Sequence, residues 1–455
     1  MTYPEKVLAE YVEQLSFHDL PPEVVERTKY HLLDTLGCII LGAQTPPLNK
    51  MLSIIKRFGG AGSSTLIGKD YRTDCLNAAL FNGAAAHAYE FDDLHRLSVI
   101  HPGAVIIPAT LALGESLNVN GRTILLAIVA GYEVMIRIGM ALGKSHYYFW
   151  HTTATAGVFG SAAACSKLLQ LDSESILNAF GNAGTQASGL WEFKSDGAMS
   201  KLLHTGRASQ SGMLSALLAS EGFTGAKRIL GGEKGLLKAT SKDYHLEKVD
   251  ENLGEKFRLL ETSVKLYPSC GHTHPAIHAI LKLQKRAHFP ISDIHEVIVR
   301  TYSAAVDVAG VENPVNPYQA KFSLKYCVAI ALKEGGVKLQ HFTERVLEDL
   351  TLRKLMSKIK IIIDPELDKA YPNEWLTSIT ILLKNGNKLE ESAAYPDGDP
   401  EDPFWKQQVI SKFMNLTSGI LEESVGKEVV KKTLSFDSLS DVRDFITLLR
   451  ISHTL

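Results

Sequence analysis

Helical segments dominate the first half of the chain, and several of them are rich in alanine, glycine and serine. They cover Ala78–Tyr89, Ala104–Ser116, Thr123–Leu142, Thr153–Leu169, Ser173–Ala187 and Ser200–Ser220. Side chains this small allow helix axes to approach closely, whereas a helix at a protein surface needs a distinct polar face. We therefore expect a tightly packed and largely buried helical bundle.

The pattern changes near residue 262. Glu296–Tyr302 alternates between apolar and polar residues, and Lys358–Ile363 has the β-branched content of a strand. The stretches 378–384 and 387–392 flank Asn385-Gly386, which predicts a hairpin with a type I′ turn. Helices are expected at about 274–287 and 320–334. This region has the pattern of an α+β domain.

The last part of the chain is helical again, with helices expected over Phe404–Ser424 and Asp441–Leu449. A chain of 455 residues exceeds the roughly 250–300 residues of one hydrophobic core, so two domains are expected. We predict a mainly α protein with an all-helical domain (1–261 and 396–455) and an inserted, smaller α+β domain (262–395).

Charge and targeting signals narrow the function class. There are 48 Lys and Arg against 50 Asp and Glu, which argues against a nucleic-acid partner. The N-terminus has no signal-peptide pattern, and Gly131 and Glu133 interrupt the apolar stretch Thr123–Val134, so no membrane span is expected. The five cysteines are scattered without a C-x-x-C pair. These features predict a cytoplasmic protein that acts on a small molecule.

The segment from His87 to Gly103 is the strongest candidate for chemistry. An alanine-rich helix leads into Asp92, Asp93 and His95, and a short loop then presents His101. Ionisable groups at a helix end can line a cleft, where burial shifts pKa values towards neutrality. General acid–base chemistry is favoured. A solvated helix end and an Asp/His metal site are the alternatives.

Two further stretches supply histidine and lysine. His151 directly precedes a small-residue helix, with Thr152 or Thr153 as its expected N-cap, and the helix dipole there favours a neutral imidazole. The alternative is a histidine packed beside aromatic residues. Lys201 and His204 share one face of a later helix, where cations suit a carboxylate substrate. A plain solvated face has the same pattern.

A fourth stretch precedes the helix at about 274. Lys265, Ser269 and Cys270 lie close together there. The Ser269 hydroxyl and backbone amides at the helix start could bind a carboxylate. A cysteine nucleophile paired with histidine is the less favoured alternative.

Together these stretches resemble the MmgE/PrpD family, which includes 2-methylcitrate dehydratase, cis-aconitate decarboxylase and iminodisuccinate epimerase. The resemblance extends over nearly the whole chain. It rests on EFDDLH…HPG at 90–103, the helix after His151, and four segments: SKLLHTGRAS at 200–209, EGFTG at 221–225, KLYPSCGHTHPAI at 265–277 and FSLKY at 322–326. It implies a helical domain completed by the C-terminal tail, an inserted α+β lid, a homodimer, and no metal or organic cofactor.

The resemblance also implies a function and a set of site residues. It implies a lyase that breaks a bond at a carbon next to a carboxylate in a small di- or tricarboxylate. An epimerase of the iminodisuccinate type is the alternative, and a non-catalytic polycarboxylate-binding protein is more remote. His101 and His151 are expected to act as acid and base, Asp93 to orient one imidazole, and Tyr326 to donate a proton or hydrogen bond. The residues expected to bind substrate are Lys201, His204, Lys265, Ser269, Cys270 and His95.

Overall fold

The computed structural model describes residues 3–451 and divides by packing into two units. The helical unit comprises Met1–Ala88, Asp92–Val264 and Lys406–Leu455, and the α+β unit comprises Tyr89–Phe91 and Lys265–Trp405. The predicted fold class, mainly helical with a small mixed sheet late in the chain, is confirmed. The ranges 1–261, 262–395 and 396–455 stay a prediction of domain boundaries.

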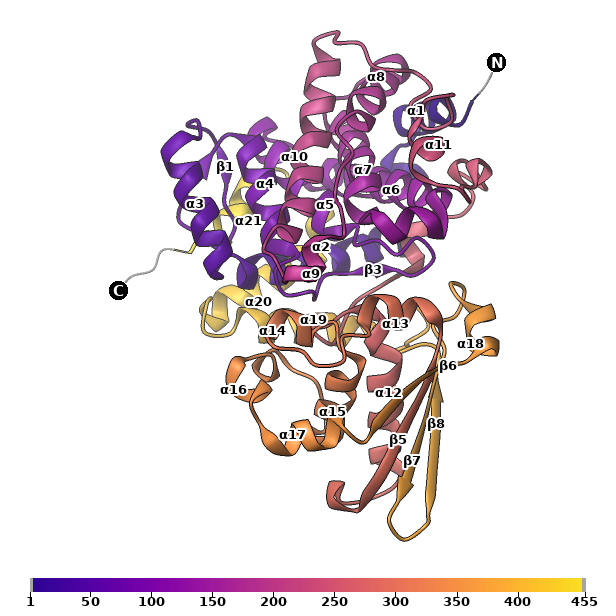
Figure 1. The fold of residues 1–455 in the computed structure, drawn as a ribbon. Coiled ribbons are helices and arrows are strands. Elements are labelled where there is room, and N and C mark those ends of the chain that lie inside the picture. Colours follow the sequence, from indigo (N-terminus) through magenta and orange to yellow (C-terminus); the bar gives the residue numbers. More distant parts are fainter. Residues whose placement is uncertain (1–2, 452–455) are drawn as a thin grey trace. The chain divides into compact units, whose positions relative to one another are not determined.

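The helical unit contains the longest helices among residues 3–451, together with shorter helices and loops (Figure 1). Its helices are α1 (Pro4–Gln14), α2 (Pro22–Gly42), α3 (Pro46–Phe58), α4 (Cys75–Ala86), α5 (Gly103–Leu117), α6 (Gly121–Phe149), α7 (Thr152–Leu168), α8 (Ser173–Gly184), α9 (Phe193–Asp196), α10 (Lys201–Ser220), α11 (Leu236–Thr240), α20 (Glu423–Leu434) and α21 (Arg443–Thr447), with most of α19 (Trp405–Thr417). Two short ladders accompany them, β1 (Ser64–Thr65) with β2 (Arg72–Thr73) and β3 (Leu94–His95) with β4 (Thr262–Ser263).

The close helix packing expected from small residues is present at the core of this unit. Helix α7 packs against α6 and α10, and nearly every residue of α7 is buried. Where α6 and α7 meet, a Cβ placed on Gly131 would lie 3.0 Å from the carbonyl oxygen of Gly160, and one placed on Gly160 would lie 2.9 Å from that of Gly131. Backbone therefore contacts backbone at this position, and only glycine fits on both sides.

Helix α6 is longer than expected because it continues past a break. Gly143 interrupts it with φ +73°, a conformation that residues with a side chain rarely adopt. By length and composition, α6 is the one helix among residues 3–451 that could cross a membrane, although 89% of its most apolar window is buried inside the protein. Burial of this kind is usual for a core helix.

The C-terminal tail packs with the N-terminal helices, as expected. Lys412 of α19 forms a buried ion pair with Asp34 of α2, with 2.7 Å between Nζ and Oδ1. The expected single helix over 404–424 is wrong, because α19 ends at Thr417 and α20 begins at Glu423. Between them Gly419 has φ +75°, which ends the first helix.

The α+β unit is built on a four-stranded sheet with the order β6-β5-β7-β8. Strand β5 (Ile294–Thr301) is parallel to β6 (Ile359–Ile363) and antiparallel to β7 (Thr377–Leu383), which is antiparallel to β8 (Lys388–Ala393). Helix α12 (His274–Arg286) packs against β7 and β8 (Figure 1). The other helices are α13 (Ser303–Ala309), α14 (Pro317–Ala320), α15 (Leu324–Glu334), α16 (Glu344–Leu347), α17 (Leu350–Met356) and α18 (Pro365–Ala370).

The predicted hairpin is present, but its turn differs from the expected type. Gly386 has φ +89°, whereas Asn385 is not left-handed, and the amide of Leu383 donates to the carbonyl of Asn387. A type I′ turn needs both central residues left-handed, so that prediction is wrong. The connection is a longer loop that needs only one glycine.

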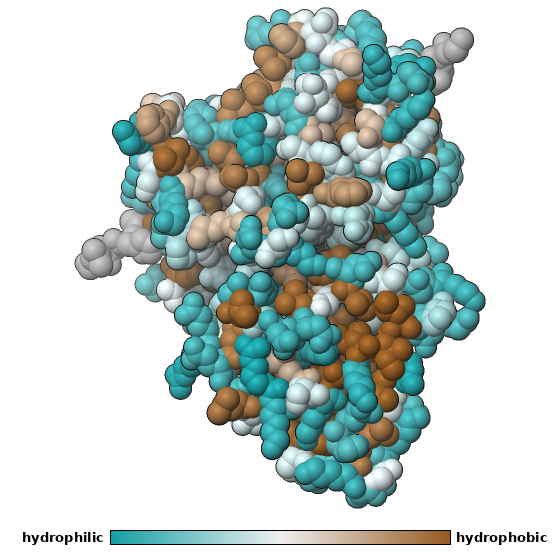
Figure 2. Space-filling model, in the orientation of Figure 1, coloured by the Kyte–Doolittle hydropathy of each residue, from teal (hydrophilic) through white to brown (hydrophobic). Residues whose placement is uncertain are grey.

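Strand β6 lies at one edge of the sheet and carries exposed apolar side chains. Ile362 and Ile363 are 41% and 48% exposed. Figure 2 shows hydrophobic side chains gathered on this unit near β6 and α13.

Candidate functional site

Four histidine rings gather in the helical unit, which we call the histidine cluster. Their ring centroids lie 5.0 Å apart for His87 and His101, 5.6 Å for His87 and His151, 6.2 Å for His101 and His151, and 5.3 Å for His151 and His204. His87 ends α4, His101 precedes α5, His151 caps α7 and His204 lies on α10. Four separate helices therefore bring these rings together.

The loop before His101 is held in a strained conformation. Val99 is β-branched yet has φ +50°, which disfavours such a side chain. The loop is closed on both sides, because the amide of His95 donates to the carbonyl of Ile100 (2.9 Å) and the reverse bond is also present (3.4 Å). Strained backbone of this kind collects at functional sites, and here it leads directly to His101.

The main-chain carbonyl of Asp93 determines the tautomer of His101. Its oxygen lies 2.6 Å from Nδ1 of His101. Because a carbonyl can only accept, Nδ1 must carry a proton and donate it. In the neutral ring Nε2 is then unprotonated, so it is the nitrogen of His101 that can exchange a proton with a substrate.

The side chain of Asp93 has a different environment from the one expected. It accepts hydrogen bonds from the Tyr132 hydroxyl (2.7 Å) and the Gly103 amide (2.9 Å), and it is fully buried. Burial raises the pKa of Asp93 to about 8, although the Tyr132 hydrogen bond opposes the shift. Ionising the Asp93 carboxyl is therefore costlier than ionising an exposed one. The residue orients His101 through its backbone.

Two residues of the candidate segment from His87 to Gly103 that received no role from the sequence lie beside His101. Oδ2 of Asp92 lies 2.7 Å from Nδ1 of His87 and 3.7 Å from Nδ1 of His101, and the Asp92 and His87 side chains are fully buried. The signal in the sequence was a histidine five residues before the first of two aspartates, across a predicted helix end. That spacing matches no standard motif, which is why it carried no weight.

His87, Asp92 and His101 could also hold a metal ion, since one ligand atom from each lies within 4.8 Å of the others. Two imidazoles and a carboxylate suit a first-row transition metal. However, ligands around tetrahedral zinc, with bonds of about 2.0–2.1 Å, lie about 3.3 Å apart. The 2.7 Å between His87 and Asp92 is instead a hydrogen-bond distance. The geometry fits a hydrogen-bonded pair better than a metal centre.

His151 is held as a neutral ring. Burial, and then the charges of Lys201 and His204, lower its pKa well below the usual value for histidine. The structure corrects the expected N-cap, because His151 itself occupies that position and Thr152 begins α7. The reason is that the backbone of His151 is extended, with its amide donating to Gly189 (2.8 Å).

Lys201 lies on the aromatic side of the cluster. Its Nζ lies 5.7 Å from the ring centres of Trp191 and Phe193, and Trp191 also contacts His151, with 5.0 Å between centroids. Aromatic faces stabilise a buried cation without neutralising it. The structure thus brings Asp93, His101, His151, Lys201 and His204 together in the helical unit.

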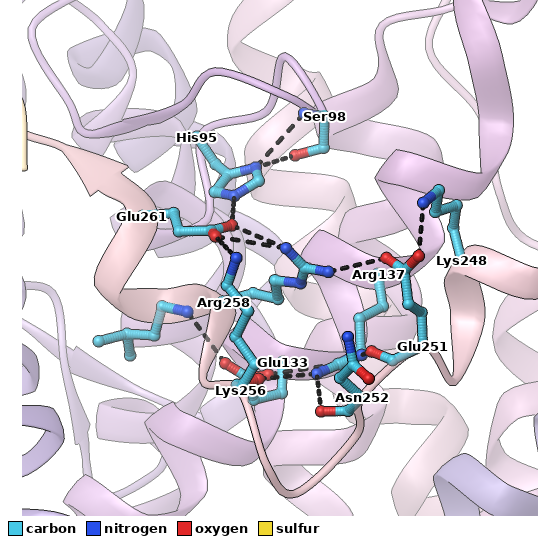
Figure 3. Close-up of polar contacts among 11 residues, drawn as sticks. His95, Ser98, Glu133, Arg137, Lys248, Glu251, Asn252, Lys256, Arg258 and Glu261 are labelled. Carbon is cyan, nitrogen blue, oxygen red and sulfur yellow. Dashed lines mark hydrogen bonds and ion pairs between the residues drawn. The ribbon is translucent and has the colours of Figure 1, made fainter. Parts of the chain in front are cut away.

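His95 belongs to a different set of contacts (Figure 3). Its Nδ1 lies 2.7 Å from the Ser98 hydroxyl and its Nε2 lies 3.4 Å from Glu261, which also contacts Lys256 and Arg258. Both ring nitrogens therefore face protein groups. The ladder between β3 and β4 pairs His95 with Thr262 at the same place. The role of His95 in substrate binding stays a prediction.

The other expected site residues lie in the α+β unit. The Lys265 ammonium donates to the carbonyl of Glu90 (3.1 Å), and the Cys270 amide donates to that of Lys321 (2.9 Å). Ser269 shares a hydrogen bond with the Thr273 hydroxyl (2.8 Å). The Tyr326 hydroxyl donates to the carbonyl of His341 (2.5 Å), and burial raises its pKa.

Comparison with known proteins assigns the chain to one family. The model of the MmgE/PrpD N-terminal domain matches residues 6–248, and that of the MmgE/PrpD C-terminal domain matches residues 267–435. The chain belongs to the MmgE/PrpD family. The earlier resemblance is thereby confirmed, and the histidine cluster falls within the N-terminal domain of the family.

Characterised MmgE/PrpD proteins similar to this chain are lyases. A cis-aconitate decarboxylase of Aspergillus terreus is 30% identical over 97% of this chain and 95% of its own length. The Homo sapiens cis-aconitate decarboxylase is 28% identical over 96% of this chain and 93% of its own. The 2-methylcitrate dehydratase of Escherichia coli is 22% identical, covering 87% and 86%.

Proposed function

We propose that the protein is a lyase that acts on a small di- or tricarboxylate by acid–base chemistry of its own side chains, with cis-aconitate decarboxylation as the first candidate. The observation that carries this proposal is the 30% identity to a cis-aconitate decarboxylase over 97% of the chain. The histidine cluster supports it, because the cluster supplies the proton-transfer groups that such a reaction needs.

The proposed reaction breaks the bond between a carboxylate and its neighbouring carbon. The electron pair of that bond stays on the carbon framework, carbon dioxide leaves, and one proton is added to carbon. His101 is suited to supply that proton from Nε2, since its Nδ1–H is fixed by Asp93. Lys201 is a buried cation beside His151 and suits a substrate carboxylate.

A direct assay tests this proposal. Purified protein is incubated separately with cis-aconitate, 2-methylcitrate and iminodisuccinate, and NMR follows carbon dioxide release, loss of water or racemisation. We expect decarboxylation of cis-aconitate, and we expect His101→Ala and His151→Ala to lower kcat by about 10²–10⁴-fold. His245→Ala is the matched control, because that imidazole is exposed on the surface.

Dehydration of 2-methylcitrate is the second candidate, favoured by the similarity to the Escherichia coli enzyme. Loss of water from 2-methylcitrate without turnover of cis-aconitate would replace the first candidate by the second. Racemisation of iminodisuccinate alone would point to an epimerase. Binding of all three compounds without turnover of any would overturn the lyase proposal.

A further inference from the structure

The side chains of Asp92 and His87 form a buried pair that faces His101, and the proposed lyase mechanism has not used either of them. Oδ2 of Asp92 lies 2.7 Å from Nδ1 of His87 and 3.7 Å from Nδ1 of His101. One carboxylate oxygen is therefore shared between two imidazoles.

We propose that Asp92, held in place by His87, is the positioning residue that stabilises the protonated form of His101. The inference rests on the proposed function only in giving His101 a catalytic role. The two aspartates then have different roles. The Asp93 backbone carbonyl determines which nitrogen exchanges a proton, and the Asp92 carboxylate supplies the opposing charge.

The physical argument begins with burial. A histidine that donates a proton must first be an imidazolium, and an imidazolium in a dry site is costly unless an anion lies nearby. The carboxyl of Asp93 is a poor anion at neutral pH because burial raises its pKa to about 8. Asp92 is buried as well, but its Oδ2 accepts a hydrogen bond from His87 at 2.7 Å and lies 3.7 Å from Nδ1 of His101, so it is placed to balance the charge of that ring.

His87 supplies the constraint on Asp92. Its Nδ1–H donates to Oδ2 of Asp92 at 2.7 Å. This hydrogen bond holds Oδ2 near His101, whose Nδ1 lies 3.7 Å from the same oxygen. The ring of His87 also packs against those of His101 and His151, with centroids 5.0 and 5.6 Å away. These contacts fix the direction of the carboxylate.

The charge balance around His101 includes groups from several elements. Those that titrate or carry charge and face His101 or its immediate partners include His87, Asp92, Asp93, His151, His31, Tyr132, Asp34, Lys412, Lys201 and His204. The cations and additional imidazoles disfavour a second positive charge. Asp92 is an anion in direct contact with the His101 ring, so removing its charge should destabilise the protonated form of His101 most.

The test is NMR titration of the histidine rings in the full-length protein, together with kinetics on whichever substrate is turned over. Replacing Asp92 by asparagine keeps its shape and removes its charge. We expect Asp92→Asn to lower the apparent pKa of His101 by at least about one unit and to lower kcat about 10–100-fold, with KM changed less than threefold. Asp74→Asn is the matched control, because it changes a carboxylate to an amide at the N-cap of α4, where asparagine also caps well.

A second pair of variants tests the link through His87. Asparagine can present an amide donor near the position of Nδ1, whereas leucine cannot. We expect His87→Leu to reproduce the Asp92→Asn defect and His87→Asn to restore most of the His101 titration. If Asp92→Asn does not fold, the His101 titrations of His87→Leu and His87→Asn test the inference instead.

The outcomes are distinguishable. A His101 titration unchanged within 0.3 unit in Asp92→Asn would overturn this inference, whatever the enzyme turns over. Absence of turnover on every polycarboxylate would overturn the proposed function, while the NMR titration still decides the role of Asp92.

Discussion

The Nδ1 atoms of His151 and His204 lie 3.1 Å apart, so one ring must donate a proton to the other. The direction of that bond decides which nitrogen of His151 carries its proton. His204 is placed to fix the tautomer of His151, in the way that the Asp93 carbonyl fixes that of His101.

The first prediction separates this role of His204 from substrate binding. Replacing His204 by phenylalanine should lower kcat about 10–100-fold and leave KM nearly unchanged, since the change acts through His151. Asparagine at this position, which keeps a polar group near Nδ1, should restore part of kcat. Steady-state kinetics with whichever polycarboxylate the assay above finds to be turned over measures both values. A raised KM with unchanged kcat would instead support the sequence-based prediction that His204 binds substrate.

The second prediction concerns stability in acid. Burial raises the pKa of Glu261. Hydrogen bonds from His95 and Lys256 oppose this shift and outweigh it, so that the pKa of Glu261 falls to about 2. Because this folded-state pKa is below the usual value of 4.5, Glu261 stabilises the fold above pH 4.5 and loses that effect as the pH falls towards 2. Glu261→Gln should lower Tm by about 2–4 °C at pH 6–7, with a smaller difference near pH 3.

Thermal unfolding at several pH values checks the Glu261 prediction. Glu247→Gln is a suitable control, because that carboxylate is largely exposed. A Tm difference for Glu261→Gln that stays constant from pH 3 to pH 7 would show that the carboxylate charge is not responsible.

The third prediction concerns the break in α6. Gly143 has φ +73°, and an added Cβ would lie 2.5 Å from the carbonyl oxygen of Asp243. Gly143→Ala should therefore cost about 2–5 kcal/mol of unfolding free energy, from backbone strain and steric overlap together. Gly222 has φ +81° but nothing within 4 Å of an added Cβ, so Gly222→Ala should cost only about 1–2 kcal/mol. Equal losses in urea unfolding would contradict the steric argument.

The fourth prediction tests how α19 is attached to α2. The ion pair between Lys412 and Asp34 is buried, so Asp34→Asn or Lys412→Met alone should cost about 3–5 kcal/mol by leaving an unbalanced polar group. The double variant Asp34→Leu/Lys412→Met should recover much of this loss. Glu26 and Lys406 pair between the same helices at the surface, and breaking that pair should cost at most about 1 kcal/mol. Urea unfolding of the wild type, Asp34→Asn, Lys412→Met, the double variant and Glu26→Gln measures the difference between the two pairs.

Much of the architecture was predictable because its signals are local. The small-residue stretches, the alternation of 296–302 and the Asn-Gly hairpin each indicate their element directly, and the helices and strands lie within a few residues of the predicted ranges. The failures have physical causes. The helix expected over 404–424 is broken where Gly419 adopts a left-handed conformation, and that requirement is not visible in apolar periodicity.

The candidate site could be predicted in its residue types more than in its contacts. The sequence indicated His101, His151 and Lys201 because histidine and lysine stand at helix ends and in family motifs, and their roles stay predictions. The roles of Asp92 and Asp93 were not separable, because adjacent residues differ only in the direction that the strained loop gives to their side chains. The pair of His87 and Asp92 depends on the end of α4 turning back on itself, which appears only in the fold. Homodimer formation and a cytoplasmic location stay predictions.

The short segment Tyr89–Phe91 determines where the protein can be cut into separately expressed units. It lies early in the chain, yet its backbone carbonyls accept from lysines of the α+β unit, Tyr89 from Lys321 (2.7 Å) and Glu90 from Lys265 (3.1 Å). A fragment that begins at Lys265 would lose both acceptors and leave two lysine side chains to be resolvated. Expression of residues 265–405 alone should therefore yield an incomplete fold, and a fusion in which a linker joins residues 89–91 to this fragment is the better design.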